Sequence, residues 1–99
     1  MHLLEKHPLV DCDLEEAALW YGRRDPAIAN LFITAAETAM RAAAADPSRF
    51  PPRIGDCRRV RLAGFPYAVL FEVAECRICV VAIAHLSRDL PELVHKRQV

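Results

Sequence analysis

The stretch that decides the fold runs from Arg59 to Ala84 and reads RVRLAGFPYAVLFEVAECRICVVAIA. Charged and apolar side chains alternate in Arg59–Leu62, while apolar, β-branched and aromatic residues dominate Tyr67–Val73 and Arg77–Ala84, as is typical of strands. Short turn sequences at residues 63–66 and 74–75 separate these three segments. Three consecutive strands with short connections predict an antiparallel meander.

Upstream of this stretch, the apolar residues recur with the period of a helix. A first helix opens in an acidic segment, where Asp11 or Asp13 can cap it and complement the positive end of its dipole, and it ends at Gly22. An Asp-Pro pair at residues 25–26 is a second start signal, and this helix runs to about Ala45. The alanines let the two helices approach closely, so an αα-hairpin is expected.

The remaining segments complete the expected order. Leu3–Val10 is apolar and contains Pro8, which cannot donate to an interior ladder, so we expect an edge strand there. Asp46–Asp56 is a proline-rich loop whose Phe50 packs back on the core, and Asp89–Arg97 is either a short helix or a tail. The order β-α-α-β-β-β predicts one α+β domain over residues 1–99, a helical hairpin packed on a small antiparallel sheet.

The composition narrows the classes of protein further. The 99 residues carry 13 basic and 13 acidic side chains, so the chain as a whole lacks the basic excess of many nucleic-acid binders. No apolar run approaches the about 18 residues of a membrane span, and the N-terminus lacks the apolar core of a signal peptide. We therefore expect a cytoplasmic protein that does not bind a membrane.

Four cysteines raise the question of a disulfide or a metal site. Cys76 and Cys79 form a CxxC pair, but residues three apart on a strand face opposite sides, which is a poor geometry for shared ligation. A zinc site would need Cys12, Cys57 or a histidine close by. Reduced thiols are the expectation for a cytosolic chain with its own core, so we predict neither metal nor cofactor.

Five segments with recognisable patterns follow one another along the chain: Asp13–Tyr21, Asp25–Phe32, Arg58–Leu62, Phe65–Phe71 and Val81–Arg88. This ordered set resembles the RelE/ParE toxin superfamily, and the resemblance covers about Asp11–Arg97. It implies the toxin of a bacterial type II toxin–antitoxin system. Its expected partner is a cognate antitoxin whose tail wraps the toxin, forming a toxin–antitoxin hetero-oligomer.

The resemblance leaves three functions open. ParE-like members inhibit DNA gyrase, whereas RelE-like members cleave mRNA on the ribosome with several lysines and arginines and a C-terminal tyrosine or histidine. Attack of a ribose 2′-OH on the adjacent phosphate needs a base, an acid and cations. Lys6 and Lys96 are the only lysines, and no tyrosine follows Arg88. A gyrase inhibitor without a catalytic centre is therefore favoured, with an mRNA endonuclease or a non-toxic protein-binding module as alternatives.

The densest basic patch supplies the candidate target-binding residues, which are Arg58, Arg59, Arg61 and Arg88. The same pattern is also typical of the solvated face of a strand. If the protein is an enzyme, its centre is expected to combine Arg59, Arg61, His85 and Arg88 on the open face of the sheet, since the unperturbed pKa of histidine suits acid–base work.

The candidate antitoxin-binding residues lie at the chain ends and at the end of the first helix: Leu3, Leu4, Arg23, Arg24, Leu90 and Leu93. Apolar termini on a small domain suggest a surface covered by a partner. The alternative is that the C-terminal segment folds back on its own sheet. Trp20, Tyr21 and Phe32 are expected in the core.

Overall fold

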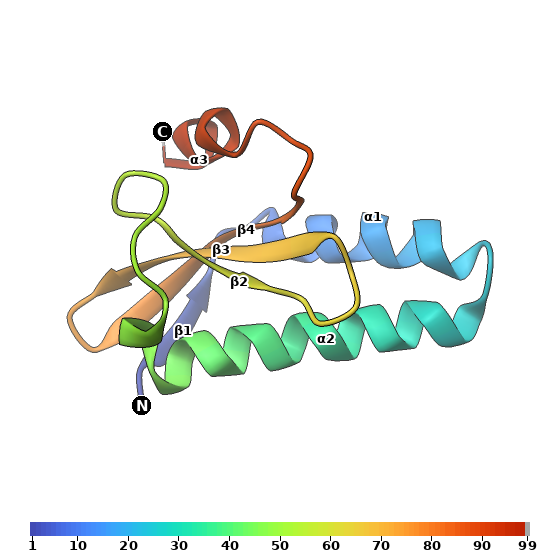
Figure 1. The fold of residues 1–99 in the computed structure, drawn as a ribbon, viewed down its shortest axis with the longest axis horizontal. Helices are drawn as coiled ribbons and strands as arrows, with labels where there is room; N and C mark the ends of the chain where they lie inside the picture. The colour runs from blue at the N-terminus through green and yellow to red at the C-terminus, as the bar shows by residue number, and fades with distance from the viewer. Residues whose placement is uncertain (99) are drawn as a thin grey trace.

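One four-stranded sheet carries helices on both of its faces (Figure 1). The computed structural model describes residues 1–98. The elements follow in the order β1 (Leu3–Lys6), α1 (Val10–Gly22), α2 (Pro26–Ala45), a 3₁₀ turn (Pro47–Arg49), β2 (Arg58–Arg61), β3 (Tyr67–Ala74), β4 (Arg77–His85) and α3 (Leu90–Gln98). The predicted α+β class and order are confirmed, and the C-terminal segment is a helix.

The two long helices begin in different ways. Asp25 has an extended backbone and its side chain accepts a 3.0 Å hydrogen bond from the Ala27 amide, so α2 starts with the predicted cap. The prediction that Asp11 or Asp13 caps α1 is wrong, because the helix already begins at Val10. His7 makes the preceding turn instead, since its Nδ1 accepts from the Leu9 amide at 3.0 Å.

The sheet is mixed, whereas an antiparallel sheet was expected. Its strand order is β1-β4-β3-β2, and β2, β3 and β4 form the predicted antiparallel meander. The edge strand β1 is shorter than expected and pairs parallel to β4. The physical reason is the length of α2, which carries the chain back until the His2 amide donates to the Ala44 carbonyl at 2.8 Å. The second half of the chain therefore starts at the same end of the sheet as β1.

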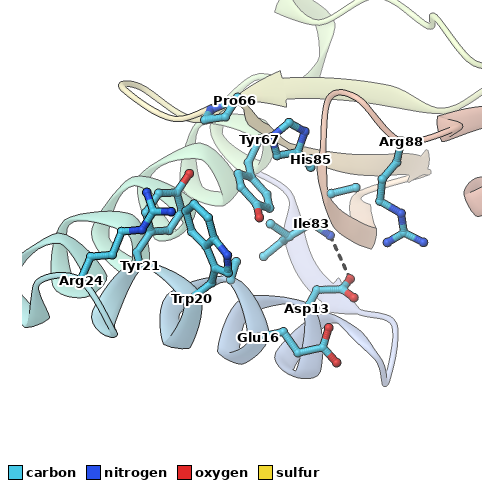
Figure 2. A pocket seen from close by; sticks show the side chains of 12 residues that line it. Asp13, Glu16, Trp20, Tyr21, Arg24, Pro66, Tyr67, Ile83, His85 and Arg88 are labelled. Atoms are coloured by element: carbon cyan, nitrogen blue, oxygen red, sulfur yellow. Dashed lines mark hydrogen bonds between the residues drawn. The ribbon is translucent and has the colours of Figure 1, made fainter.

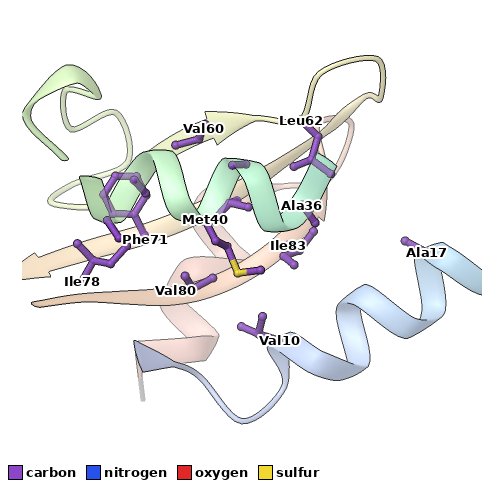
Figure 3. Close-up of a cluster of buried hydrophobic side chains, with 14 of the residues drawn as sticks. Val10, Ala17, Ala36, Met40, Val60, Leu62, Phe71, Ile78, Val80 and Ile83 are labelled. Carbon is purple, nitrogen blue, oxygen red and sulfur yellow. The ribbon is translucent and has the colours of Figure 1, made fainter. Parts of the chain in front are cut away.

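The main core lies between the sheet and the helices α1 and α2 (Figure 3). Phe32, Phe71, Ile78 and Val80 are fully buried there. Small residues let the helices approach closely, as predicted: a Cβ added at Gly22 would lie 3.3 Å from the Cβ of Ala29. Phe50 packs back on this core, also as predicted.

A smaller core lies on the opposite face of the sheet, under α3 (Figure 1). Leu90, Leu93 and Val94 of α3 are buried against small strand residues such as Ala82 and Ala84. The C-terminal segment thus folds back on its own sheet. The domain therefore has three layers: the α1–α2 hairpin, the sheet, and α3.

Candidate functional site

The arginines of β2 do not form one surface. Arg58 faces the helices and donates from Nη1 to the carbonyls of Pro47 (3.1 Å) and Phe50 (3.2 Å). It therefore holds the proline-rich loop against the sheet, and its predicted contact with a target remains untested. Arg59 and Arg61 alternate to the other face, because they pair with Leu70 and Ala68 of the core under α3.

His85 lies on the face of the sheet that α1 and α2 cover, away from Arg59 and Arg61 on the face under α3. It pairs with Tyr67, whose ring packs on the main core. The reason is a bulge: Leu70 pairs with Ala82 but Phe71 pairs with Val80, so Val81 is an extra residue in β4. Unbroken alternation from Ile78, with Val81 counted as an ordinary strand residue, would have placed His85 on the face of Arg59, as expected from the sequence.

His85 and Arg88 instead line a groove of about 600 Å³ between α1 and the end of β4 (Figure 2). His85 Nδ1 accepts a 3.0 Å hydrogen bond from the Ser87 amide, so in the neutral ring the proton resides on Nε2. Figure 2 shows the Tyr67 hydroxyl pointing into the groove. Burial, and then the neighbouring Tyr21, raise the pKa of Tyr67.

The opposite wall of the groove comes from α1 and includes Trp20, which was wrongly expected in the core. Trp20 is 47% exposed, and the Arg24 guanidinium lies 4.2 Å from its ring centroid. Tyr21 and Phe32 do join the core, where their rings stack with centroids 5.4 Å apart. Trp20 lies outward because Ala17 and Ala18 occupy the buried positions of α1.

A buried ion pair that no sequence pattern indicated lies at the Asp13 end of this groove. Arg97 donates to both carboxylate oxygens of Asp13, from Nη1 at 2.9 Å and from Nη2 at 2.8 Å, and only 9% and 11% of the two side chains are exposed. Arg97 Nη1 also donates to the Val81 carbonyl at 2.9 Å, and the Ile83 amide donates to Asp13 at 3.1 Å. The hydrogen bonds to Asp13, more than offsetting burial, raise the pKa of Arg97.

This pair serves the backbone edge of β4 that β1 leaves uncovered, because β1 pairs only with Arg77–Val80. No local signal could have revealed it, since 84 residues separate Asp13 from Arg97. Asp13, one of the two carboxylates expected to cap α1, thus makes a tertiary contact instead.

A second groove, of about 730 Å³, runs between α1 and α2 on the side away from the sheet. Its walls are mostly apolar, from residues such as Leu14, Leu19 and Ile33, and Arg23 lies at its border. Leu19 and the nearby Leu31 are each 62% exposed. The sequence pattern did not single out this groove.

The residues predicted to bind an antitoxin are spread over different surfaces. Arg23 lines the apolar groove and Arg24 the groove beside β4, while Leu3 is exposed on the edge strand and Leu4 packs partly on the main core. Leu90 and Leu93 lie on the inner side of α3, where they are buried against the sheet, not exposed as a binding surface. The contacts of all six with an antitoxin remain predictions.

The cysteines are free thiols at separate places. Cys12 and Cys76 are exposed, Cys79 is half-buried and Cys57 is fully buried. Burial, with a smaller contribution from Glu72, raises the pKa of Cys57 to about 11. Among residues 1–98, no cluster of three metal-binding side chains occurs. The same part of the chain contains no helix both long and apolar enough to span a membrane.

The comparisons with known proteins agree with this geometry. Residues 4–90 match the family described as "ParE toxin of type II toxin-antitoxin system, parDE". A solved structure titled "Chromosomal ParDE TA system from P. aeruginosa" has the same fold, with a TM-score of 0.75 and 17% identity over 86% of this chain and 96% of that one. No curated protein matches the chain. The chain therefore belongs to the ParE toxin family and is the toxin component of a type II toxin–antitoxin system.

Proposed function

We propose that this toxin arrests growth by inhibiting DNA gyrase, and that a cognate antitoxin neutralises it. The observation that supports a non-enzymatic mode of action is the separation of the candidate catalytic residues by the sheet. Arg59 and Arg61 lie on the face under α3, whereas His85 lies on the face of α1. Cleavage of RNA needs a base, an acid and cations around one phosphate.

The state of His85 supports the same proposal. Its Nδ1 is occupied by the Ser87 amide, so the neutral ring has no free acceptor nitrogen and is not arranged as a general base. The mRNA endonuclease is therefore the second candidate, and gyrase is the target that the family resemblance favours.

The apolar groove between α1 and α2 fits the antitoxin. An amphipathic or extended segment of a partner would bury Leu14, Leu19 and Ile33, and Arg23 at the border would pair with an acidic side chain of that segment. The solved structure with the same fold is itself a toxin–antitoxin system, which supports a protein occupant. Neutralisation then requires a complex of toxin and antitoxin.

Controlled expression followed by two assays tests this proposal. Growth should stop on induction and resume when the reading frame adjacent to the toxin gene is co-expressed. The purified toxin should inhibit DNA supercoiling by purified gyrase while cellular mRNA stays intact in primer extension. Cleavage of mRNA within codons, together with normal supercoiling, would establish the endonuclease instead.

A matched pair of variants tests the assignment of the antitoxin groove. Leu19→Ser places a hydroxyl on an exposed wall of the groove, so it should weaken antitoxin binding in a pull-down while leaving the fold intact. Thr38→Ser, at an exposed position of α2 outside the groove, is the control. Equal antitoxin binding by the two variants would remove the groove from the interface.

A further inference from the structure

We propose that the groove between α1 and the end of β4 is the surface with which the toxin engages its target, and that it receives an acidic, extended segment of a target protein. The identity of that protein as gyrase rests on the proposed function above. The groove itself is defined by Trp20 and Arg24 on one side and by Tyr67, His85 and Arg88 on the other (Figure 2).

The side chains of this groove are those that dominate the binding energy of protein interfaces. Tryptophan, tyrosine and arginine are enriched at such positions, and the two aromatic side chains bury a large area while losing little conformational freedom. Trp20 is held between Arg24, 4.2 Å from its ring centroid, and the edge of Tyr21, with ring centroids 5.0 Å apart. The most exposed aromatic residue of the domain thus already packs against two neighbouring side chains of the toxin.

The charges of the groove favour an acidic occupant. Asp13 is neutralised by Arg97, which leaves Glu16 as the one free carboxylate in the lining. Arg24 and Arg88 lie toward opposite ends of the groove (Figure 2), and within residues 1–98 neither forms an ion pair with a carboxylate. Two arginines that have no ion-pair partner within the described part of the chain, beside the single free carboxylate of Glu16, are complementary to acidic side chains of a partner.

The arrangement of the rings favours a protein over a single-stranded nucleic acid. Binding of single strands uses aromatic faces on which bases can stack. Here the rings contact one another: Tyr67 meets Phe32 and His85 edge-on, with centroids 5.0 and 5.1 Å apart, and Arg24 covers a face of Trp20. On the face of Trp20 that Arg24 covers, a base could stack only after displacing the guanidinium.

The shape of the groove indicates a short extended segment. The wall runs from Asp13 along α1 to Arg24, which lies just beyond the end of the helix, and at the helical rise per residue this span is about 16 Å. An extended chain covers that length in about five residues. The groove therefore matches a segment with acidic side chains near its two ends and an apolar side chain between them, next to Trp20 and Tyr67.

The two grooves use opposite sides of α1. Asp13, Glu16, Ala17, Trp20, Tyr21 and Arg24 line the one beside β4, whereas Leu14, Glu15, Ala18, Leu19, Gly22 and Arg23 line the apolar one. No residue lines both. Substitutions can therefore separate binding of the target from binding of the antitoxin.

The decisive experiment compares Arg24→Ala/Arg88→Ala with Arg41→Ala, which removes an exposed arginine of α2 that lines neither groove. The double variant should keep the melting temperature of the wild type. It should also keep antitoxin binding, because this proposal assigns Arg24 to the target in place of the antitoxin contact expected from the sequence. It should lose growth arrest and bind purified gyrase at least about tenfold more weakly, with a shallower dependence on salt. Arg41→Ala should behave as the wild type in every assay.

A spectroscopic measurement reports on the groove directly, because Trp20 is the only tryptophan of the chain. Toxin labelled with fluorotryptophan should give one fluorine resonance that shifts or broadens when gyrase is added. If gyrase binds the toxin, a resonance that responds to the antitoxin and not to gyrase would overturn the proposal. Loss of antitoxin binding in the double variant while growth arrest persists would overturn it too. Binding of an oligothymidylate that the double variant loses would assign the groove to nucleic acid.

Failure of the proposed function would be distinguishable from failure of this inference. If wild-type toxin neither binds nor inhibits gyrase, gyrase is not the target. In that case, growth arrest by the double variant still tests whether the groove binds the target. Loss of arrest by the folded double variant supports the inference, and retained arrest refutes it.

Discussion

Replacing Arg97 by methionine removes the donors of the buried ion pair and keeps most of the side-chain stem. The Asp13 carboxylate is then left with the 3.1 Å hydrogen bond from the Ile83 amide, and the Val81 carbonyl loses a 2.9 Å donor. A carboxylate with 11% of its side chain exposed cannot recover full hydration. The variant therefore carries an uncompensated charge between α1, β4 and α3.

The size of the effect follows from this loss. Breaking a buried pair by removing one partner costs about 3–5 kcal/mol, and the residual exposure here places the expected loss in the free energy of unfolding near 3 kcal/mol. For a domain of this size, such a loss lowers the melting temperature by roughly 12–24 °C. Asp13→Asn should cost less, since its side-chain carbonyl can still accept from the Ile83 amide.

Urea unfolding of Arg97→Met, Asp13→Asn and the double variant measures this as a thermodynamic cycle, with a coupling energy of about 2 kcal/mol expected. Lys96→Met is the matched control on the same helix, because the pair of Lys96 with Glu92 is largely exposed and should contribute about 0.5 kcal/mol or less. The reasoning is refuted if Arg97→Met is no more destabilising than Lys96→Met.

Four further predictions concern stability and thiol chemistry. Phe32→Ala empties a fully buried site among three aromatic rings and should cost about 3–5 kcal/mol in urea unfolding, so a loss below about 1 kcal/mol would contradict the packing. Arg58→Met should cost about 2 kcal/mol and speed proteolysis within residues 46–57, because two loop carbonyls lose their donor; an unchanged digestion rate would count against that role. Cys57 should react with iodoacetamide at neutral pH only after unfolding, whereas Cys12 and Cys76 react in the native state. Since burial raises the pKa of Cys57 from 9.0 to about 11, stability should fall as the pH rises through that range, and Cys57→Ala should abolish this part of the fall.

Much of the fold could be predicted because its signals are local. The Asp-Pro start of α2 and the period-two alternation of the meander depend on residues adjacent in sequence, whose preferences survive in the folded chain. The structure contains the expected edge strand at the N-terminus, but this strand runs parallel to its neighbour and not antiparallel as expected. A strand pattern carries no information on parallel pairing, which the return of α2 to His2 decides.

The candidate site was predicted less well because a single residue changed which side chains share a face. Arg59, Arg61 and His85 were expected together, and each lies on or at the end of a strand, as predicted. Because the bulge at Val81 interrupts the alternation, His85 lies on the face of the sheet that α1 and α2 cover. Alternation counts residues along one strand, whereas a bulge is defined only by the partner strand.

The amino-acid sequence by itself determined the class of fold, the order of its elements and the resemblance to a toxin family, because these depend on periodicity, capping residues and turns that act over a few positions. The partners of the charged side chains, by contrast, depend on the tertiary structure. It pairs Asp13 with Arg97 across 84 positions, commits Arg58 to a loop and leaves Arg24 and Arg88 lining one groove. Charge interactions depend on distance in space, and for residues far apart along the chain that distance is set by packing.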